Sequence, residues 1–204
     1  TFGLPQGNRL RQPRNRLLFS YSVDGEQRVL IDRATSGLGD IAVSAGKQLV
    51  YNETAAASLW TSLKLPTGSS DKLTGSGGVD VGLWGAGSRQ LARNWYVYGR
   101  LGALLLQRGD VAPSEQSGQV GFGTLGTSFR PWRWLTLRVQ ADGNTSFYED
   151  TNTRALSDAL QLASGVSIRI GAHWGLDFAV AEDVKVESAP DVHFHVGLRY
   201  MPFE

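Results

Sequence analysis

The sequence predicts an all-β fold, an antiparallel up-and-down transmembrane β-barrel, and three observations lead to it. Apolar and polar residues alternate along many segments of about ten residues. The connections between these segments alternate between short and long, and charged residues stand in the middle of several segments, on the polar side. We expect about nine to eleven strands in this chain and about 12 in the full protein, because such barrels usually have an even number.

Composition excludes several other classes of protein. Hydrophobic residues make up 41% of the 204 residues and charged residues 19%, so the chain is not a disordered tail. The net charge is +1 without a basic run, and we therefore expect no nucleic-acid partner. The absence of cysteine excludes disulfide scaffolds, thiolate zinc sites and cysteine nucleophiles. No apolar stretch approaches the roughly 20 residues of a membrane-spanning helix, whereas a spanning strand needs only about 10.

The first element is a hairpin. Residues 15–23 and 28–33 flank Asp24–Gly25, a dipeptide typical of tight hairpin turns. The hairpin can be the rim of an external loop or a pair of wall strands. We expect residues 1–39 to form an extracellular loop and hairpin region that follows missing N-terminal strands, and residues 40–204 to form the strands of the barrel.

Nine strands are predicted from residue 40 onward. The earlier ones alternate less cleanly, and 118–129 is placed mainly by its position between neighbours. An alternative for 154–163 is a short helical turn. The predicted strands cover residues 41–51, 55–65, 79–91, 95–106, 118–129, 135–142, 162–173, 174–181 and 192–200.

The lengths of the connections separate a membrane barrel from soluble folds. Short links at 52–54, 92–94, 130–134 and 173–175 take turns with long links at 66–78, 108–117, 145–159 and 182–191. Outer-membrane barrels have short periplasmic turns and long external loops. A soluble β-sandwich has Greek-key crossovers that break this order, although a sandwich or a lipocalin-like barrel would explain the composition equally well.

The polar face is expected to line the lumen. A charged group costs several kcal/mol in hydrocarbon but not in a water-filled interior. The solvated face of an ordinary antiparallel sheet would also carry such residues. The lumen-facing polar residues are predicted to be Lys64, Asp80, Arg100, Arg138, Gln140, Arg169, Asp177 and Arg199, and the lipid-facing ones to include Leu137, Val139, Ile168, Ile170, Phe178, Val196 and Leu198.

Aromatic residues gather where the short turns are expected. Amphipathic rings at strand ends are typical of the belt at a membrane interface. Trp60 and Trp84 depart from the pattern, since they stand mid-strand on the presumed inner face. The predicted belt comprises Tyr51, Trp95, Phe129, Trp132, Trp134, Trp174, Tyr200 and Phe203.

Several motifs resemble those of a known family. Ser36–Asp40 opens a strand, and Leu63–Gly68 closes one before a glycine-rich loop. Together with Phe2–Gly7 and Leu198–Tyr200, they make the whole chain similar to an uncharacterised proteobacterial outer-membrane β-barrel family, known only as a domain of unknown function. The resemblance implies no activity that can be carried over. It implies an N-terminally truncated copy, because the stretch like Phe2–Gly7 follows earlier strands in similar members.

Two details refine this expectation. Phe203 is out of phase with Tyr200, and Glu204 follows it, whereas barrels usually end on an aromatic residue in phase with the outward face. In addition, nine strands that begin with a downward one cannot close. We therefore expect the strand at 41–51 not to pair with the strand at 192–200, which leaves an incomplete wall.

Other candidate sites are weaker. His193 and His195 share one strand face and could bind one metal ion, but no third ligand is visible. Ser188, Glu187 and Asp191 beside His193 could form a hydrolase site at the rim. They lie in one loop, the usual place for polar residues, so we expect no catalytic residue, metal or cofactor.

The function expected from these features is a passive channel or binding barrel with a polar lumen. It would lie in the cell outer membrane, with outer-membrane lipid and a small, unidentified solute as partners. The first alternative is a rim-located outer-membrane lipid hydrolase similar to lipid A deacylases. A structural or assembly role is a weaker alternative, and neither solute nor oligomeric state follows from the sequence.

Overall fold

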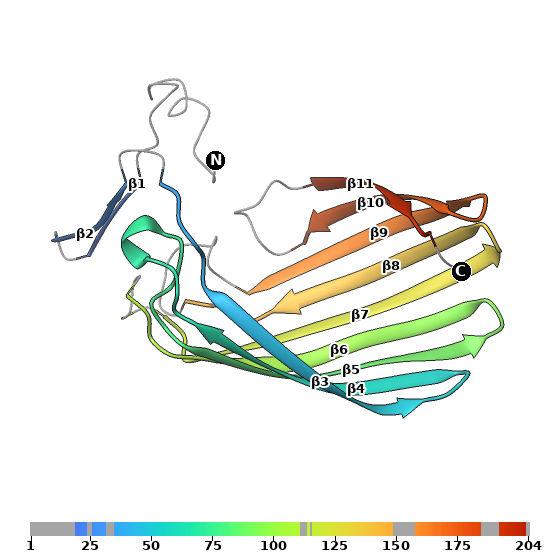
Figure 1. Cartoon of the computed structure of the whole chain (residues 1–204), viewed down its shortest axis with the longest axis horizontal. Coiled ribbons are helices and arrows are strands. Elements are labelled where there is room, and N and C mark those ends of the chain that lie inside the picture. The colour runs from blue at the N-terminus through green and yellow to red at the C-terminus, as the bar shows by residue number, and fades with distance from the viewer. Residues whose placement is uncertain are drawn as a thin grey trace, which may run out of the picture.

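The computed structural model is an antiparallel meander of strands (Figure 1). It describes residues 19–23, 26–31, 35–110, 114, 116–148, 158–184 and 192–202. No helix in these ranges is long and apolar enough to cross a membrane. The strands are β1 (Phe19–Val23), β2 (Glu26–Ile31), β3 (Ile41–Tyr51), β4 (Ala55–Leu65), β5 (Asp80–Ala92), β6 (Trp95–Leu106), β7 (Gln119–Trp132), β8 (Leu135–Asn144), β9 (Ala159–Ile170), β10 (Trp174–Asp183) and β11 (Val192–Tyr200), with one 3-10 turn, η1 (Ser70–Lys72).

Strands β3 to β11 form one nine-stranded sheet in which each strand pairs with the next in sequence. The predicted all-β, up-and-down arrangement is therefore confirmed. The sheet is curved, with one concave and one convex face (Figure 1). Strands β3 and β11 are its two ends, and among the described residues no ladder joins them, as predicted.

The hairpin of β1 and β2 forms a two-stranded sheet of its own. In the described residues it does not extend the nine-stranded sheet as a pair of wall strands. The turn at residues 24–25 and residues 1–18 and 32–34 lie outside the described part. The assignment of residues 1–39 to the extracellular side stays a prediction.

Four of the nine predicted strands, at 41–51, 55–65, 95–106 and 192–200, have the observed bounds, and the other five differ by one to three residues at one or both ends. Strand β7 continues to Trp132, because a bulge after Phe129 lets Trp132 pair with Leu135. Strand β9 begins at Ala159, where it pairs with Asn144, and this start excludes a helical turn from residue 159 onward. The links 93–94 and 133–134 are shorter than predicted, because β5 continues to Ala92 and β7 to Trp132.

Short links lie at one end of the sheet and long links at the other (Figure 1). The first short link is closed by Asn52, whose Oδ1 accepts the backbone N–H groups of Thr54 and Ala55 at 3.0 and 2.9 Å. The last contains Gly171 at φ 63°, a left-handed conformation that glycine adopts without strain. The alternation of connection lengths is confirmed.

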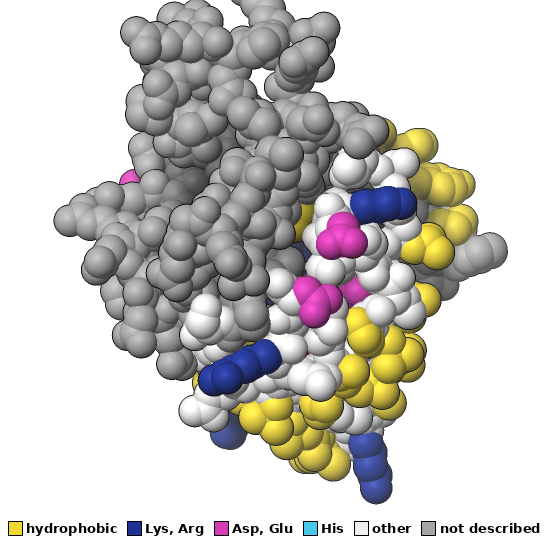
Figure 2. Space-filling view, turned by 90° about the vertical axis from the view of Figure 1, so that its left-hand side faces the viewer, with side chains coloured by type: hydrophobic (Ala, Val, Ile, Leu, Met, Phe, Trp, Pro, Cys, Tyr) yellow, Lys and Arg dark blue, Asp and Glu magenta, His cyan; other side chains and the backbone are white. Residues whose placement is uncertain are grey.

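The described part of the chain has almost no buried apolar interior. Val120 is its one buried hydrophobic side chain, whereas Leu101 and Leu125 are 75% and 72% exposed. Both leucines point to the convex face, as do Val139, Val196 and Leu198. Seen from the long-loop end, apolar side chains lie along the outer margin of the described strands (Figure 2). A soluble sheet of this size would bury one of its faces.

Candidate functional site

The concave face collects the polar side chains of the sheet. Facing residues of paired strands point to the same side, and the register links the polar positions from β4 to β11. The structure places all eight sequence-predicted polar residues on this face: Lys64, Asp80, Arg100, Arg138, Gln140, Arg169, Asp177 and Arg199. Lys64 and Asp80 lie toward the long-loop end, and Arg169 and Arg199 toward the short-link end.

An ion-pair cluster at the long-loop end fixes the loop between β4 and β5. The ammonium group of Lys64 contacts Asp80 and lies 3.4 Å from Oδ2 of Asp40. Asp40 also accepts the backbone N–H groups of Ser76 and Gly68, each at 2.9 Å. These two hydrogen bonds, Ser76 first, and the nearby Lys64 lower the pKa of Asp40 below its ordinary value of 3.8. Asp40 therefore joins the entry of β3 to both halves of the loop.

Three aromatic rings form a row across the concave face, one level below this cluster. Trp60 and Trp84 are parallel within 6°, with ring centroids 6.1 Å apart. Phe122 follows at 6.3 Å from Trp84, on the far side of Gly102. A Cβ at residue 102 would overlap both Trp84 and Phe122, so the close passage of the rings requires glycine there. The rings form an apolar part of this face together with Leu104, Leu106 and Val120.

A hydrogen-bonded chain crosses β6, β7 and β8 below the aromatic row. Arg100 donates from Nε to Oγ1 of Thr124 at 3.0 Å, and Thr124 donates to Asp142 at 2.6 Å. The other carboxylate oxygen of Asp142 accepts from Nε2 of Gln140 at 2.6 Å. The phenol of Tyr98 then donates to Oε1 of Gln140 at 3.0 Å. Both oxygens of Asp142 are thus occupied within the wall, and the guanidinium of Arg100 also lies 5.7 Å from the Phe122 ring.

A second polar chain crosses β8 to β11. Arg138 donates from Nη1 to Oγ of Ser167 at 2.7 Å, and this hydroxyl donates in turn to Asp177. Arg199 donates from Nη2 to the same carboxylate oxygen at 3.2 Å. Ser167 is 8% exposed, so its hydroxyl is a buried link between two charged groups. This chain neutralises Asp177 without a direct contact to Arg138.

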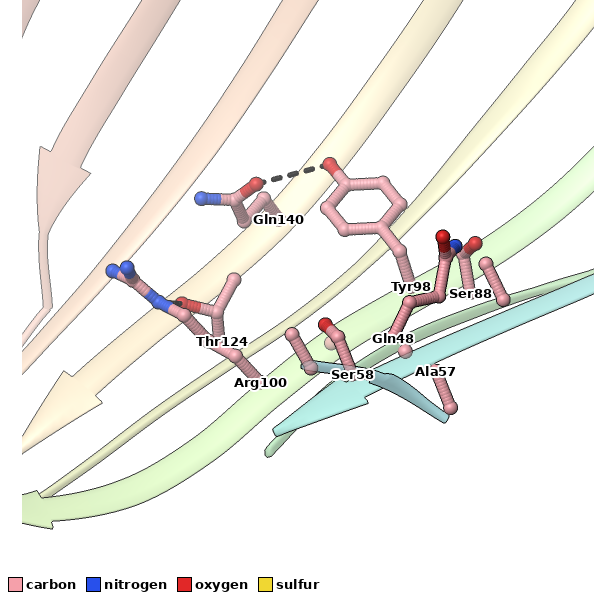
Figure 3. A pocket seen from close by; sticks show the side chains of 12 residues that line it. Gln48, Ala57, Ser58, Ser88, Tyr98, Arg100, Thr124 and Gln140 are labelled. Carbon is pink, nitrogen blue, oxygen red and sulfur yellow. Dashed lines mark hydrogen bonds between the residues drawn. The ribbon is translucent and has the colours of Figure 1, made fainter. Parts of the chain in front are cut away.

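The two polar chains border two hollows on the concave face. The larger has a volume of about 580 Å³ and lies between β3 and β8, where the side chains of Gln48, Ser58 and Arg100 border it (Figure 3). The smaller has a volume of about 390 Å³ and is bordered by Arg138, Asp177, His195 and Arg199, among others. Tyr98 and Gln140 line both, so the hollows meet at this hydrogen-bonded pair. The result is a polar track along the face.

The alternative sites receive no support from the described residues. His193 and His195 lie on the concave face of β11, and no group of three or more metal-ligating side chains is found in the described ranges. The hydrolase candidates Glu187, Ser188 and Asp191 lie outside those ranges.

Aromatic side chains also gather at the short-link end. Trp174 packs against Tyr200 with centroids 4.9 Å apart, and Trp132 stacks on Trp134 at 5.5 Å. Trp95 and Phe129 face each other across β6 and β7 and are about half exposed. Exposed aromatic rings at one level of a sheet suit a water–hydrocarbon boundary. Phe203 of the predicted belt lies outside the described residues.

Sequence reasoning missed the partners that hold the charged residues. Tyr98, Thr124 and Ser167 bind predicted residues directly, and Gln48 and Ser58 line the larger hollow. Each of these residues stands in phase with the polar positions of its own strand, so the alternation in the sequence could have placed it on the polar face. The anchoring of the loop between β4 and β5 by Asp40 could not be predicted from the alternation, because its partners Gly68 and Ser76 lie 28 and 36 residues away in the sequence.

Comparisons with known proteins agree with this architecture. The family model described as "Protein of unknown function (DUF3187)" matches residues 1–201, and the chain belongs to that family. No protein with curated annotation matches the sequence. Among solved structures, the fold is similar to the COG4313 outer membrane channel from Pseudomonas putida F1, with a TM-score of 0.62. The two are 21% identical, and the match covers 81% of this chain and 67% of that one.

Proposed function

We propose that the protein is an outer-membrane β-barrel whose strands β3 to β11 form wall, with lipid against the convex face and a polar path for small solutes along the concave face. The observation that carries the proposal is the inverted distribution of side chains. Apolar residues such as Leu101, Leu125 and Val196 are exposed on the convex face, while the hydrogen-bonded arginines and acids line hollows on the other.

Energetics favour lipid as the medium outside the convex face. Exposed aliphatic side chains in this number would drive aggregation of a soluble protein. In a bilayer the same residues are solvated by acyl chains. The backbone N–H and C=O groups of the strands inside the sheet, β4 to β10, are satisfied by hydrogen bonds to the neighbouring strands. The aromatic residues at the short-link end, Trp95, Phe129, Trp174 and Tyr200, would then mark one membrane interface.

The size and polarity of the concave face favour a path for solutes over a filled interior. The hollows are open, and hydroxyl, amide and guanidinium groups lie among the alanine and glycine residues that line them. Hollows of about 580 and 390 Å³ remain beside the side chains of this wall. That the structural neighbour is described as an outer membrane channel supports the same reading.

Three measurements test the proposal. Membrane fractionation of a Gram-negative host should place the protein in the outer-membrane fraction, and the purified protein should give stepwise currents in planar bilayers. Liposomes containing it should swell in small sugars or salts faster than protein-free liposomes. Recovery of a soluble, monomeric protein would contradict the membrane location, and insertion without current or swelling would contradict the path.

A matched pair of variants connects the current to the concave face. Ser88 lines the larger hollow, whereas Ser164 lies on the convex face of β9 and is exposed. Ser88→Trp should reduce the single-channel current, because the ring would occupy part of the hollow. Ser164→Trp should insert and leave the current unchanged. Equal effects of the two substitutions would show that current does not follow this face.

A further inference from the structure

The positive charges of the concave face remain available to a ligand. Arg100, which lines the larger hollow, uses Nε for its bond to Thr124, and its two terminal amino groups lie beside Thr124 at one side of that hollow (Figure 3). Arg138 uses Nη1 for Ser167, and Arg199 uses Nη2 for Asp177. A guanidinium carries five N–H donors, so each arginine keeps donors beyond the bond that holds it. All three side chains belong to exposed residues, and that of Arg199 is 51% exposed.

The negative charges of the same face are paired or held inside the wall. Asp80, at the long-loop end, is paired with Lys64. One carboxylate oxygen of Asp142 accepts a hydrogen bond from Thr124, and the other accepts one from Gln140. Asp177 accepts from Ser167 and Arg199, and its side chain is 27% exposed, about half the value of its partner. Asp183 accepts from Nε2 of Gln161 at 2.8 Å. Acids that are half-buried and hydrogen-bonded present less charge to the hollow than arginines with open donors.

We propose that the concave face is an anion-selective path on which small solutes bearing carboxylate or phosphate oxygens pair first with Arg100 and then with Arg138 and Arg199. The inference rests on the proposed function and names the class of solute. The planar guanidinium binds two oxygens of an oxyanion at once. The hydroxyls of Ser58 and Ser88 line the larger hollow away from the Arg100 guanidinium and are further donors there.

The hollows give the arginines an order along the path. Arg100 borders the larger hollow, and Arg138 and Arg199 border the smaller one. Tyr98 and Gln140 stand between them and line both. An anion can therefore exchange one guanidinium for the next without leaving a polar surface. Several moderate sites in series permit passage, whereas a single tight site would retain the solute.

The reversal potential of the purified protein in planar bilayers, measured under a potassium chloride gradient, tests the inference. We expect a potential that indicates preference for chloride. Arg100→Gln and Arg138→Gln should each lower the anion-to-cation permeability ratio by up to roughly tenfold, because one unit charge at about 6 Å in water changes the occupancy of the anion and of the cation about threefold each, in opposite directions. Arg100→Lys keeps the charge and should keep most of the preference. Addition of succinate or inorganic phosphate should reduce the chloride current in the wild type more than in Arg100→Gln.

The control is Arg89→Gln, which removes the same charge from the convex face of β5, where Arg89 lies opposite Ala55 and Val97. It should leave the ratio unchanged. Preference for potassium in the wild type, or an equal shift in Arg89→Gln and Arg100→Gln, would overturn the inference while leaving the proposed path intact. A protein that inserts and conducts no current would overturn both.

Discussion

The ring of Tyr98 lies directly over Gly126 on the neighbouring strand, where any Cβ would overlap the ring. This contact sets the position of the phenol, which donates to Gln140 at the meeting point of the two hollows. Gly126→Ala should therefore displace Tyr98 and lower the free energy of unfolding by about 1–3 kcal/mol, as overpacked sites do. Urea unfolding of the protein in detergent or lipid, followed by tryptophan fluorescence, measures the change.

The control for this substitution is Gly85→Ala in strand β5. A Cβ at residue 85 meets nothing within 4 Å. Its effect should stay within about 0.5 kcal/mol, the usual range for a surface change. If both alanine variants were equally stable, the contact between Gly126 and Tyr98 would not position the phenol.

A charge placed on each face of the sheet tests the membrane orientation. Leu101 is 75% exposed on the convex face of β6, and Ser88 lines the larger hollow. If lipid covers the convex face, Leu101→Arg should destabilise the inserted protein by about 2–4 kcal/mol, the cost of arginine near the middle of a barrel wall. Ser88→Arg should have a small effect, because the hollow contains water. Refolding into lipid vesicles at increasing urea concentration gives both values.

The same two substitutions, Leu101→Arg and Ser88→Arg, can also contradict the proposed orientation. On a soluble protein, arginine in place of an exposed leucine changes stability by no more than about 0.5 kcal/mol. A small effect of Leu101→Arg combined with a large effect of Ser88→Arg would exchange the two faces and contradict the proposed function.

The strands could be predicted because one physical rule acts on each of them. A wall between an apolar and a polar medium forces a period of two, so segments such as 41–51, 95–106 and 192–200 have the predicted bounds. Strand β7 was the weakest prediction for an equally physical reason. Two of its inward positions are the apolar residues Val120 and Phe122. Val120 is buried, and Phe122 packs against Trp84. That ring row interrupts the polar face and therefore the alternation.

The site could be predicted only in part. Alternation selects the residues of one face, and Arg100, Arg138 and Asp177 stand on it together. Which of them bind one another depends on the register between strands, and a single sequence does not contain it. The link from Arg138 to Asp177 through Ser167 is an example, since it joins three strands. The anchoring of the loop by Asp40 depends on loop geometry, for which no periodic signal exists.

Asp40 should control the accessibility of the loop between β4 and β5. Asp40→Asn weakens the attraction to Lys64 and the hydrogen bonds from Ser76 and Gly68. We expect trypsin to cleave after Lys72 several-fold faster at neutral pH, while the wall strands stay protected. Asp71→Asn is the control, because Asp71 is an exposed residue of η1 in the same loop. Equal acceleration in both variants would assign the effect to loop charge rather than to the anchor.

The anchor of Asp40 also has a defined dependence on pH. The pKa of Asp40 is lower in the folded protein than its ordinary value of 3.8, mainly through the hydrogen bond from the Ser76 amide. A depressed pKa stabilises the folded state above the unfolded value, and this contribution disappears as the pH falls through the folded value. The stability difference between wild type and Asp40→Asn should therefore be constant above about pH 5 and shrink below pH 3.8. Thermal unfolding across this range measures the difference, and a maximum near pH 3 would contradict the sign.

Ser167 should contribute more to stability than any exposed serine of its strand. Its buried hydroxyl accepts from Arg138 and donates to Asp177, so Ser167→Ala leaves two charged groups without their link. The loss should be about 1–3 kcal/mol, the cost of leaving a buried hydrogen-bonding group unsatisfied. Ser164→Ala, on the convex face of the same strand, is the control and should be close to neutral. Urea unfolding of both variants in lipid vesicles provides the comparison. A Ser167→Ala variant as stable as Ser164→Ala would mean that water replaces the hydroxyl. Arg138 would then be solvated in the smaller hollow and would not depend on its bond to Ser167.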